Sequence, residues 1–364
     1  MDEDKIYMRR AVRLAGRSRG LVSPGALVGA VIVHKGTIVG EAAYKSLGGP
    51  HAETEAIAAA GERCRGSTLY VTLEPCAHYG STPPCADAII SAGIRRVVCA
   101  LEDPDKRVCG KGFRRLRKAG VLVEVGLLAD EAERGNAAFL THRRTGKPLV
   151  ILKLAQTLDG RIATKFKSSK WITGKKARQH AHLWRSWVDG VMVGAGTVLS
   201  DNPRLNVRHV RGPNPRPMVV DCKLRISPEA AIFESRTAIL ITSDAVSSHQ
   251  LRKFETAGAE IWTFPTTEGH VDLQTLICFA GKTGMTSLVI EGGRGLATAA
   301  LQEKIINEIL LYVSPRILGE GIDGVGDLDS KEVADGITLE HMEVKRLGCD
   351  LLLSGKVVYP CSLD

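Results

Sequence analysis

Short apolar runs alternate with amphipathic or alanine-rich stretches along the first third of the chain. Runs rich in Val and Ile are typical of buried strands, whereas apolar residues spaced three or four apart favour helices. The predicted strands cover residues 26–33, 68–73, 95–101 and 121–125, and the predicted helices cover residues 6–15, 52–60, 85–92 and 113–119. This alternation predicts a largely parallel sheet that is flanked by helices.

A polar, basic stretch at residues 141–148 interrupts this pattern and contains the Gly146 and Pro148 turn signals. A chain of 364 residues is long for one hydrophobic core, so we expect two domains, residues 1–146 and 147–364. The second domain is again of the α/β class. Its predicted strands cover residues 149–154, 188–193, 217–220, 238–242 and 287–290, and a helix is predicted over residues 175–187.

Composition narrows the class of partner. No apolar run approaches the roughly 20 residues that span a bilayer, so we expect no membrane partner. The net charge of +9 suits a small phosphorylated substrate, and aromatic residues make up only 5%. Because the basic residues are widely spread, we expect no nucleic-acid partner. The charged start of the chain lacks an apolar signal core and the nine cysteines are scattered, which together predict a cytoplasmic protein.

Candidate chemistry gathers at His51-Ala52-Glu53, Pro75-Cys76 and Pro84-Cys85. One imidazole and two thiolates fill three corners of a Zn²⁺ tetrahedron, and an open fourth corner is typical of catalytic zinc. The carboxylate of Glu53 is the expected proton shuttle, and the whole set is the signature of zinc nucleobase deaminases. Two alternatives stay open, a histidine and two cysteines without metal, and a structural zinc with His78 as fourth ligand.

Eight residues separate Cys76 from Cys85. The run Thr72-Leu-Glu-Pro-Cys-Ala-His-Tyr-Gly80, followed by Thr-Pro-Pro-Cys at 82–85, resembles the deaminase half of the bifunctional riboflavin-biosynthesis deaminase/reductases. The resemblance implies a cytidine-deaminase-like three-layer domain that hydrolyses the ring amine of a phosphoribosylated diaminopyrimidine. It also implies that Glu53 is catalytic, that His51, Cys76 and Cys85 bind zinc, and that Asp103 contacts substrate.

Three positions depart from that family. Gly25 stands where the family usually has Asn, Tyr44 where it has His, and Ser81 where it has a basic residue. Lost hydrogen-bond partners at a polar site change substrate discrimination strongly. Three hypotheses therefore stay open: the family substrate, another pyrimidine, or an inactive deaminase beside a working reductase. A deaminase of nucleic acid or of a free base is a further rival, but it has no need of a reductase half.

In the second half, residues 289–296 form a predicted strand, glycine-rich turn and helix start, an arrangement that can bind phosphate. With the blocks at 153–163, 169–174, 193–198 and 201–205, this segment resembles the reductase half of the same family. The resemblance implies a dihydrofolate-reductase-like α/β domain, NADPH as cofactor, and a homodimer or homotetramer. The implied cofactor-binding residues are Ala155, Trp171, Thr197, Asp201, Gly293, Arg294 and Gly295. The implied substrate-binding residues are Ser169, Arg185, Leu205, Arg208 and Glu291.

A guanidinium fork can bind phosphate with two hydrogen bonds, which suits Arg185 and Arg208 to a phosphorylated substrate. The plain alternative for each arginine is a solvated surface charge, and for Trp171 it is packing in the core.

Overall fold

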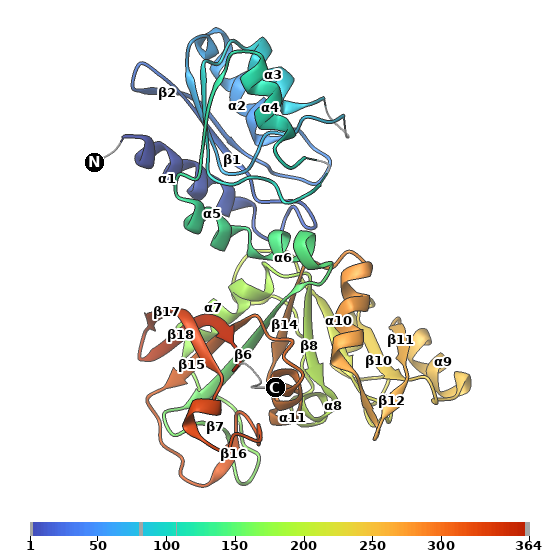
Figure 1. Ribbon diagram of the computed structural model, residues 1–364. Helices are drawn as coiled ribbons and strands as arrows, with labels where there is room; N and C mark the ends of the chain where they lie inside the picture. Colours follow the sequence, from blue (N-terminus) through green and yellow to red (C-terminus); the bar gives the residue numbers. More distant parts are fainter. Residues whose placement is uncertain (1–2, 80–82, 107, 361–364) are drawn as a thin grey trace. The chain divides into compact units, whose positions relative to one another are not determined.

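The computed structural model describes residues 3–79, 83–106 and 108–360. The chain folds into two compact units, Met1–Gly146 and Lys147–Asp364 (Figure 1). Among the described residues, no helix combines the length and apolar character needed to cross a membrane.

The first unit is built on a five-stranded sheet in the order β2-β1-β3-β4-β5. The strands are β1 (Gly29–His34), β2 (Thr37–Ala43), β3 (Thr68–Val71), β4 (Arg96–Cys99) and β5 (Leu122–Val125). β1 runs antiparallel to β2 and β3, while β3, β4 and β5 are parallel. The prediction of a largely parallel sheet is therefore wrong for β1 and β2. They form a hairpin through Lys35 and Gly36, whose φ angles of 49° and 76° are typical of a tight hairpin turn.

Helices cover both faces of this sheet and make three layers (Figure 1). Ala30 and Ile32 of β1 pack among residues of the helices on one face, while Val31 and Val33 pack against helices on the other. This alternation follows from the two-residue period of a strand. The first face carries α2 (Ala52–Ala60), α3 (Cys85–Ser91) and α4 (Lys111–Lys118), and the second carries α1 (Glu3–Ala15) and α5 (Ala129–Gly135). A further helix, α6 (Ala137–Thr145), ends this unit.

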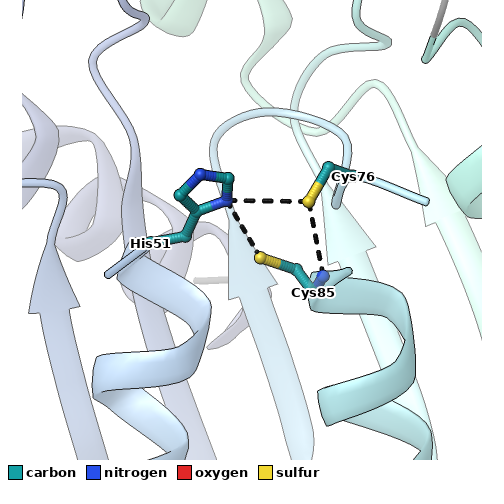
Figure 2. Close-up of side chains that lie close together, drawn as sticks. All are labelled: His51, Cys76 and Cys85. Atoms are coloured by element: carbon teal, nitrogen blue, oxygen red, sulfur yellow. Dashed lines mark hydrogen bonds between the residues drawn. The ribbon is translucent and has the colours of Figure 1, made fainter. Parts of the chain in front are cut away.

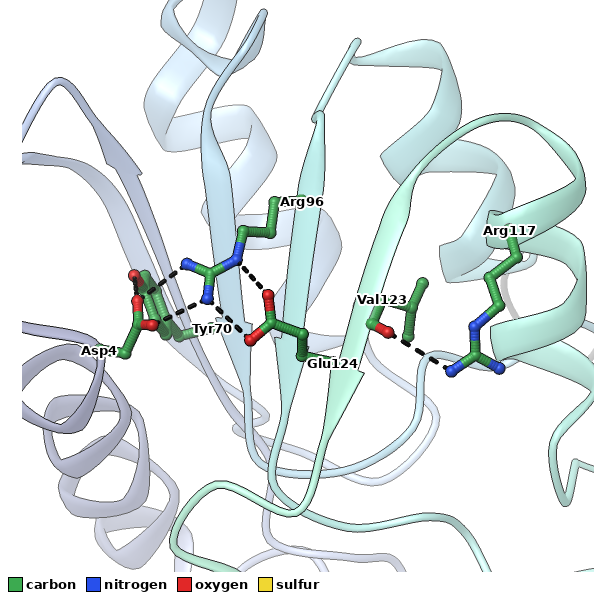
Figure 3. Close-up of polar contacts among 6 residues, drawn as sticks. All are labelled: Asp4, Tyr70, Arg96, Arg117, Val123 and Glu124. Atoms are coloured by element: carbon green, nitrogen blue, oxygen red, sulfur yellow. Dashed lines mark hydrogen bonds and ion pairs between the residues drawn. The ribbon is translucent and has the colours of Figure 1, made fainter.

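Arg96 ties the second face to the edge of the sheet (Figure 3). Its guanidinium donates two hydrogen bonds of 2.8 and 2.9 Å to Asp4 of α1, and two of the same lengths to Glu124 of β5. The hydroxyl of Tyr70 also donates to Asp4. The hydrogen bond from Arg96 lowers the pKa of Asp4, so the carboxylate stays ionised. Near the same edge, Arg117 donates to the carbonyl of Val123.

The second unit contains a nine-stranded sheet in the order β11-β10-β9-β8-β14-β6-β15-β18-β17. From β11 to β15 neighbouring strands are parallel, and β18 and β17 add an antiparallel hairpin. The strands are β6 (Leu149–Thr157), β8 (Gly190–Gly194), β9 (Arg216–Val220), β10 (Ile239–Ser243), β11 (Glu260–Phe264), β14 (Ser287–Glu291), β15 (Glu308–Ser314), β17 (Thr338–Leu347) and β18 (Asp350–Val358). Two short pairs accompany them, β7 (Arg161–Thr164) with β16 (Gly321–Asp323) and β12 (Thr266–Thr267) with β13 (His270–Val271).

One buried cluster of the second unit lies between its sheet and two helices, α10 (Leu273–Lys282) and α11 (Arg294–Gln302). Leu152, Leu288 and Ile290 of the central strands share a buried cluster with Leu276 of α10 and Ala297 of α11. Glu291 at the end of β14 is in register with Lys153 of β6, so both face the carboxyl edge of the parallel strands, where ligands bind in open α/β sheets. The helices are α7 (Lys175–Arg185), α8 (Ala195–Asp201), α9 (Ser248–Thr256), α10 (Leu273–Lys282) and α11 (Arg294–Gln302). Short 3₁₀ helices occur at Gly16–Ser18, Gly61–Cys64, Ala231–Ser235 and Val333–Asp335.

Candidate functional site

His51, Cys76 and Cys85 converge in the first unit (Figure 2). Nδ1 of His51 lies 3.1 Å from Sγ of Cys85 and 3.6 Å from Sγ of Cys76. Their ligand atoms all lie within 4.8 Å of one another, and they are the one metal-binding group found in the described part of the chain. His78 is not a member of this group, so the alternative of a four-ligand structural zinc with His78 has no geometric support.

The starts of two helices and the end of one strand bring these three side chains together. His51 is the N-cap of α2, Cys85 is the first residue of α3, and Cys76 follows β3. The backbone N–H of Cys85 donates to Sγ of Cys76 over 3.3 Å, and the N–H of Ala86 donates to the Cys76 carbonyl. The N–H of Cys85, at the start of a helix, favours a thiolate at Cys76. Hydrogen bonds from Cys85 and His51 lower the pKa of Cys76 despite its burial.

Glu53, in the first turn of α2, is 3% exposed. Burial raises the pKa of its carboxyl, and the neighbouring His51 opposes this effect. A carboxyl of this kind keeps its proton at higher pH than an exposed carboxyl does.

Two of the three departures from the family pattern are neighbours in space. The buried ring of Tyr44 meets the His51 ring edge to face, with centroids 5.5 Å apart, and its hydroxyl accepts the Gly48 N–H over 2.8 Å. A Cβ atom at Gly25 would lie 3.3 Å from Cε1 of Tyr44 and 2.8 Å from the carbonyl oxygen of Val22. A side chain at position 25 would therefore clash first with the Val22 carbonyl and would also lie close to the tyrosine ring. Ser81, the third departure, lies outside the described residues.

Asp103 is buried in the segment that follows β4. Burial raises the pKa of its carboxyl to about 6. Its Oδ1 accepts the N–H of Asp105 over 2.8 Å, and its own N–H donates to Glu74.

In the second unit, Arg185 and Glu291 form a buried ion pair. Nε and Nη2 of Arg185 donate to the Glu291 carboxylate over 2.6 and 2.8 Å, and Nη1 donates to the Asn206 carbonyl. The two side chains are 12% and 10% exposed, so the alternative of a solvated surface charge is wrong for Arg185. Although burial opposes ionisation, Arg185 and Lys153 hold the pKa of Glu291 at about 2.

Lys153 belongs to the same cluster, and the sequence analysis did not single it out. Its Nζ lies 3.9 Å from the Glu291 carboxylate and 5.7 Å from the centroid of the Tyr312 ring. Burial lowers the pKa of this amine, while Glu291 opposes the effect. A lysine inside the apolar run at residues 149–154 was the available signal.

Arg208 is exposed, and its guanidinium donates to the side-chain oxygen of Asn206 over 2.7 Å. Its backbone N–H donates to Nδ1 of His182. Burial, with Arg185 and Arg208 nearby, lowers the pKa of His182 to about 3, so this imidazole stays neutral. Leu205, in contrast, is 2% exposed and has a φ of 53°.

Of the residues that the resemblance assigns to the cofactor, Gly293, Arg294 and Gly295 lie at the start of α11, and Thr197 and Asp201 lie on α8. Gly293 precedes α11, and a Cβ there would lie 3.0 Å from Oγ1 of Thr197, so the glycine turn packs on this threonine. Ser169 donates to Asp201 over 3.2 Å. Ala155 is half-buried on β6, while Arg294 and Gly295 are exposed at the start of α11. Trp171 is 59% exposed, with Arg178 over its ring at 4.4 Å, so core packing is the wrong reading for it.

Comparisons with known proteins match both units. The family model of the cytidine and deoxycytidylate deaminase zinc-binding region matches residues 1–101, and that of the RibD C-terminal domain matches residues 148–353. The chain is 38% identical to the riboflavin biosynthesis protein RibD of Aquifex aeolicus, over 96% of this chain and 97% of that protein. It is also 38% identical to RibD of Escherichia coli, with 96% and 98% covered.

Solved structures agree with these relatives. Acinetobacter baumannii RibD, form 1, is 35% identical with a TM-score of 0.88, covering 98% of this chain and 99% of that one. A Thermotoga maritima protein described as a diaminohydroxyphosphoribosylaminopyrimidine deaminase and 5-amino-6-(5-phosphoribosylamino)uracil reductase is 33% identical with a TM-score of 0.85, covering 99% of each chain. Both predicted fold classes are thereby confirmed. The chain belongs to the RibD family of riboflavin-biosynthesis enzymes, which join a zinc-dependent deaminase to an NADPH-dependent reductase.

Proposed function

We propose that residues 1–146 hydrolyse the ring amine of a diaminopyrimidine phosphoribosyl nucleotide, and that residues 147–364 then reduce its ribosyl group to ribityl. The observation that carries the first step is the cluster of His51, Cys76 and Cys85 with buried Glu53 beside it. The name of the Thermotoga relative supports the choice of substrate.

The zinc assignment has a geometric test. Tetrahedral zinc with usual bond lengths puts its nitrogen and sulfur ligands about 3.6 Å apart. The observed separation of 3.6 Å between Nδ1 of His51 and Sγ of Cys76 agrees with this value, whereas the 3.1 Å to Sγ of Cys85 is shorter. When bound, the metal supplies Lewis-acid activation of water. Glu53 would take a proton from that water and deliver it to the leaving amine, a role for which its raised pKa suits it.

Buried Asp103 is the proposed acceptor for a polar group of the pyrimidine, because its carboxylate would otherwise be an expensive group to bury. Tyr44 stands where the family histidine would, and its hydroxyl is already held by Gly48. We therefore assign Tyr44 to the support of His51. This assignment leaves the family substrate in place despite the changes at Gly25 and Tyr44.

In the reductase, the Gly293 turn and Thr197 would hold the cofactor phosphates, together with Arg294 and Gly295. When bound, NADPH supplies the hydride. Lys153, buried between Glu291 and the ring of Tyr312, would donate a hydrogen bond to the ribose oxygen that gains a proton. Because Glu291 occupies the fork of Arg185, exposed Arg208 is the stronger phosphate-binding candidate of the two arginines. Ala155, Trp171 and Asp201 complete the proposed cofactor site, and Ser169 and Leu205 the substrate site.

A coupled assay tests the proposal. Zinc-loaded protein is given the diaminopyrimidine phosphoribosyl nucleotide, and NADPH oxidation is followed by absorbance. We expect oxidation that requires zinc and disappears in Glu53→Gln, with zinc still bound. Glu55→Gln is the matched control, because Glu55 lies on the same helix and pairs with exposed Lys45. Oxidation that starts only after an active deaminase is added would contradict the first step.

The proposal includes a cytoplasmic location and a homo-oligomer. All cysteines among the described residues are free thiols, which supports a reducing compartment. Met342 and Val344 of edge strand β17 are 58% and 59% exposed, and an exposed apolar edge supports pairing with a second copy. Light scattering of the purified protein measures the oligomeric state.

A further inference from the structure

Glu74 is a buried carboxylate that has no role in the function proposed above. It lies between β3 and Cys76 and is 4% exposed. Its Oε2 accepts the backbone N–H groups of Asp103 and Gly110 over 3.3 and 2.9 Å. Its Oε1 accepts those of Gly112 and Phe113 over 2.9 and 3.3 Å. One side chain thus satisfies four backbone donors that belong to another part of the chain.

The four donors belong to two places in the chain, the segment that carries Asp103 and the start of α4. Gly110 is the N-cap of α4, and Gly112 and Phe113 lie in its first turn. The first N–H groups of a helix lack partners within the helix, and a negative charge is favourable there. Glu74 therefore supplies both the hydrogen bonds and the charge that this helix start needs.

The contact leaves little room for adjustment. A Cβ atom at Gly112 would lie 2.0 Å from the carbonyl oxygen of Pro75 and 3.1 Å from Oε1 of Glu74. The start of α4 therefore packs directly against the backbone that leads into the zinc-ligand candidate Cys76. A shift of Glu74 would move the Cys76 turn and the Asp103 segment relative to each other.

We infer that Glu74 is a positioning residue of the deaminase, which holds Asp103 at a fixed place relative to Cys76 and so acts on substrate binding through Asp103. The inference rests on the proposed function, because it takes Asp103 as the substrate contact. Glu74 itself has both oxygens occupied by backbone donors, so its action on the substrate passes through the segment that it holds.

The full-length, zinc-loaded variant Glu74→Gln tests this inference. Glutamine keeps the length of the side chain but turns one oxygen into an NH₂ group that faces two N–H donors. We expect the KM for the diaminopyrimidine phosphoribosyl nucleotide to rise about tenfold or more, with a smaller change in kcat, on the scale of a lost hydrogen-bond network. Zinc content and the reductase rate on the deaminated nucleotide should stay unchanged. Glu102→Gln is the matched control, because Glu102 is exposed and adjoins Asp103.

A double-mutant cycle separates positioning from general damage. If Glu74 acts through Asp103, Glu74→Gln adds little to the KM of Asp103→Asn. Effects that multiply, or loss of zinc from Glu74→Gln, would overturn the inference. If the glutamine variant fails to fold, Glu74→Asp keeps the charge with a shorter reach, and the same cycle is run with it.

Hydrogen exchange supplies a readout that needs no turnover. The amides of Asp103, Gly110, Gly112 and Phe113 should be protected in the unaltered protein and exchange faster in the variant. Fast exchange in the unaltered protein would refute the role of Glu74, whatever the enzyme acts on. Absence of turnover by the unaltered protein, with these amides protected, would refute the proposed substrate and with it the role of Asp103.

Discussion

Replacing Glu291 by glutamine tests the energetics of the buried cluster in the second unit. The change removes the negative charge that lies between Arg185 and Lys153 and leaves two cations with little access to water. Breaking a buried ion pair from one side costs about 3–5 kcal/mol of folding free energy. The lowered pKa of Glu291, about 2 in place of the ordinary 4.5, corresponds to about 3 kcal/mol, which is of the same order. We therefore expect Glu291→Gln to lower the free energy of unfolding by about 3 kcal/mol.

The sign of the pH dependence follows from the same pKa. Because folding lowers the pKa of Glu291, its contribution is present above pH 4.5 and is lost as the pH falls toward 2. The difference in stability between the unaltered protein and Glu291→Gln should therefore be largest near neutral pH. This difference in stability should decrease as the pH is lowered from 4.5 toward 2.

Tryptophan fluorescence is the assay of choice for this prediction. The four tryptophans, Trp171, Trp184, Trp187 and Trp262, all lie in the second unit, so their emission during urea unfolding reports on that unit. Glu234→Gln is the control, because Glu234 pairs with Arg204 on the surface and its loss should change nothing measurable. If Glu291→Gln is as stable as the control, the cluster contributes no net stability and the reasoning is wrong.

Three further predictions concern the first unit. Tyr44→Ala should weaken zinc binding about fivefold in a chelator competition while Tyr44→Phe keeps it, because an aromatic pair contributes about 1 kcal/mol; equal loss in both variants would contradict the role of the ring. Arg96→Gln should destabilise the first unit by about 1–2 kcal/mol by circular dichroism, because it breaks the partly buried pairs with Asp4 and Glu124, and an unchanged transition would refute this. Deaminase binding of substrate should weaken as the pH falls through about 6, where Asp103 gains a proton, and a KM that is independent of pH between 5 and 7 would contradict its role.

The sequence predicted the elements that hold the zinc-ligand candidates well. The helix predicted over residues 52–60 is α2 itself, and the one over 85–92 differs from α3 by a single residue. Alanine-rich composition and turn residues immediately before His51 and Cys85 are local signals, which need no tertiary contact to act. The strand, glycine turn and helix at residues 287–302 were likewise predicted from local signals.

Elements whose stability comes from pairing were missed. β2 contains Gly40 and Glu41, which weaken a strand pattern, and its pairing with β1 supplies the missing hydrogen bonds. Most of β17 is exposed, so it carries no apolar run, and its register with β18 defines it. Residues 321–323 form β16 because they pair with β7.

The two candidate sites differ in how far their parts lie apart in the sequence. The zinc-ligand candidates fall within one stretch of the first unit, so their spacing alone predicts the chemistry. Arg185 and Glu291 lie 106 positions apart, and register between β6 and β14 brings Lys153 to them. No spacing rule relates these three residues, and only the sheet topology does.

The departures at Gly25 and Tyr44 also suggest different conclusions about function along the sequence and in the structure. Taken separately along the sequence, they are two lost substrate contacts and suggest a failing deaminase. In the structure they are neighbours, because a Cβ atom at position 25 would lie 3.3 Å from the ring of Tyr44, and this ring also meets the ring of His51. The three zinc-ligand candidates still converge beside this pair. The intact metal group therefore favours an active deaminase that departs from the family pattern at two adjacent positions.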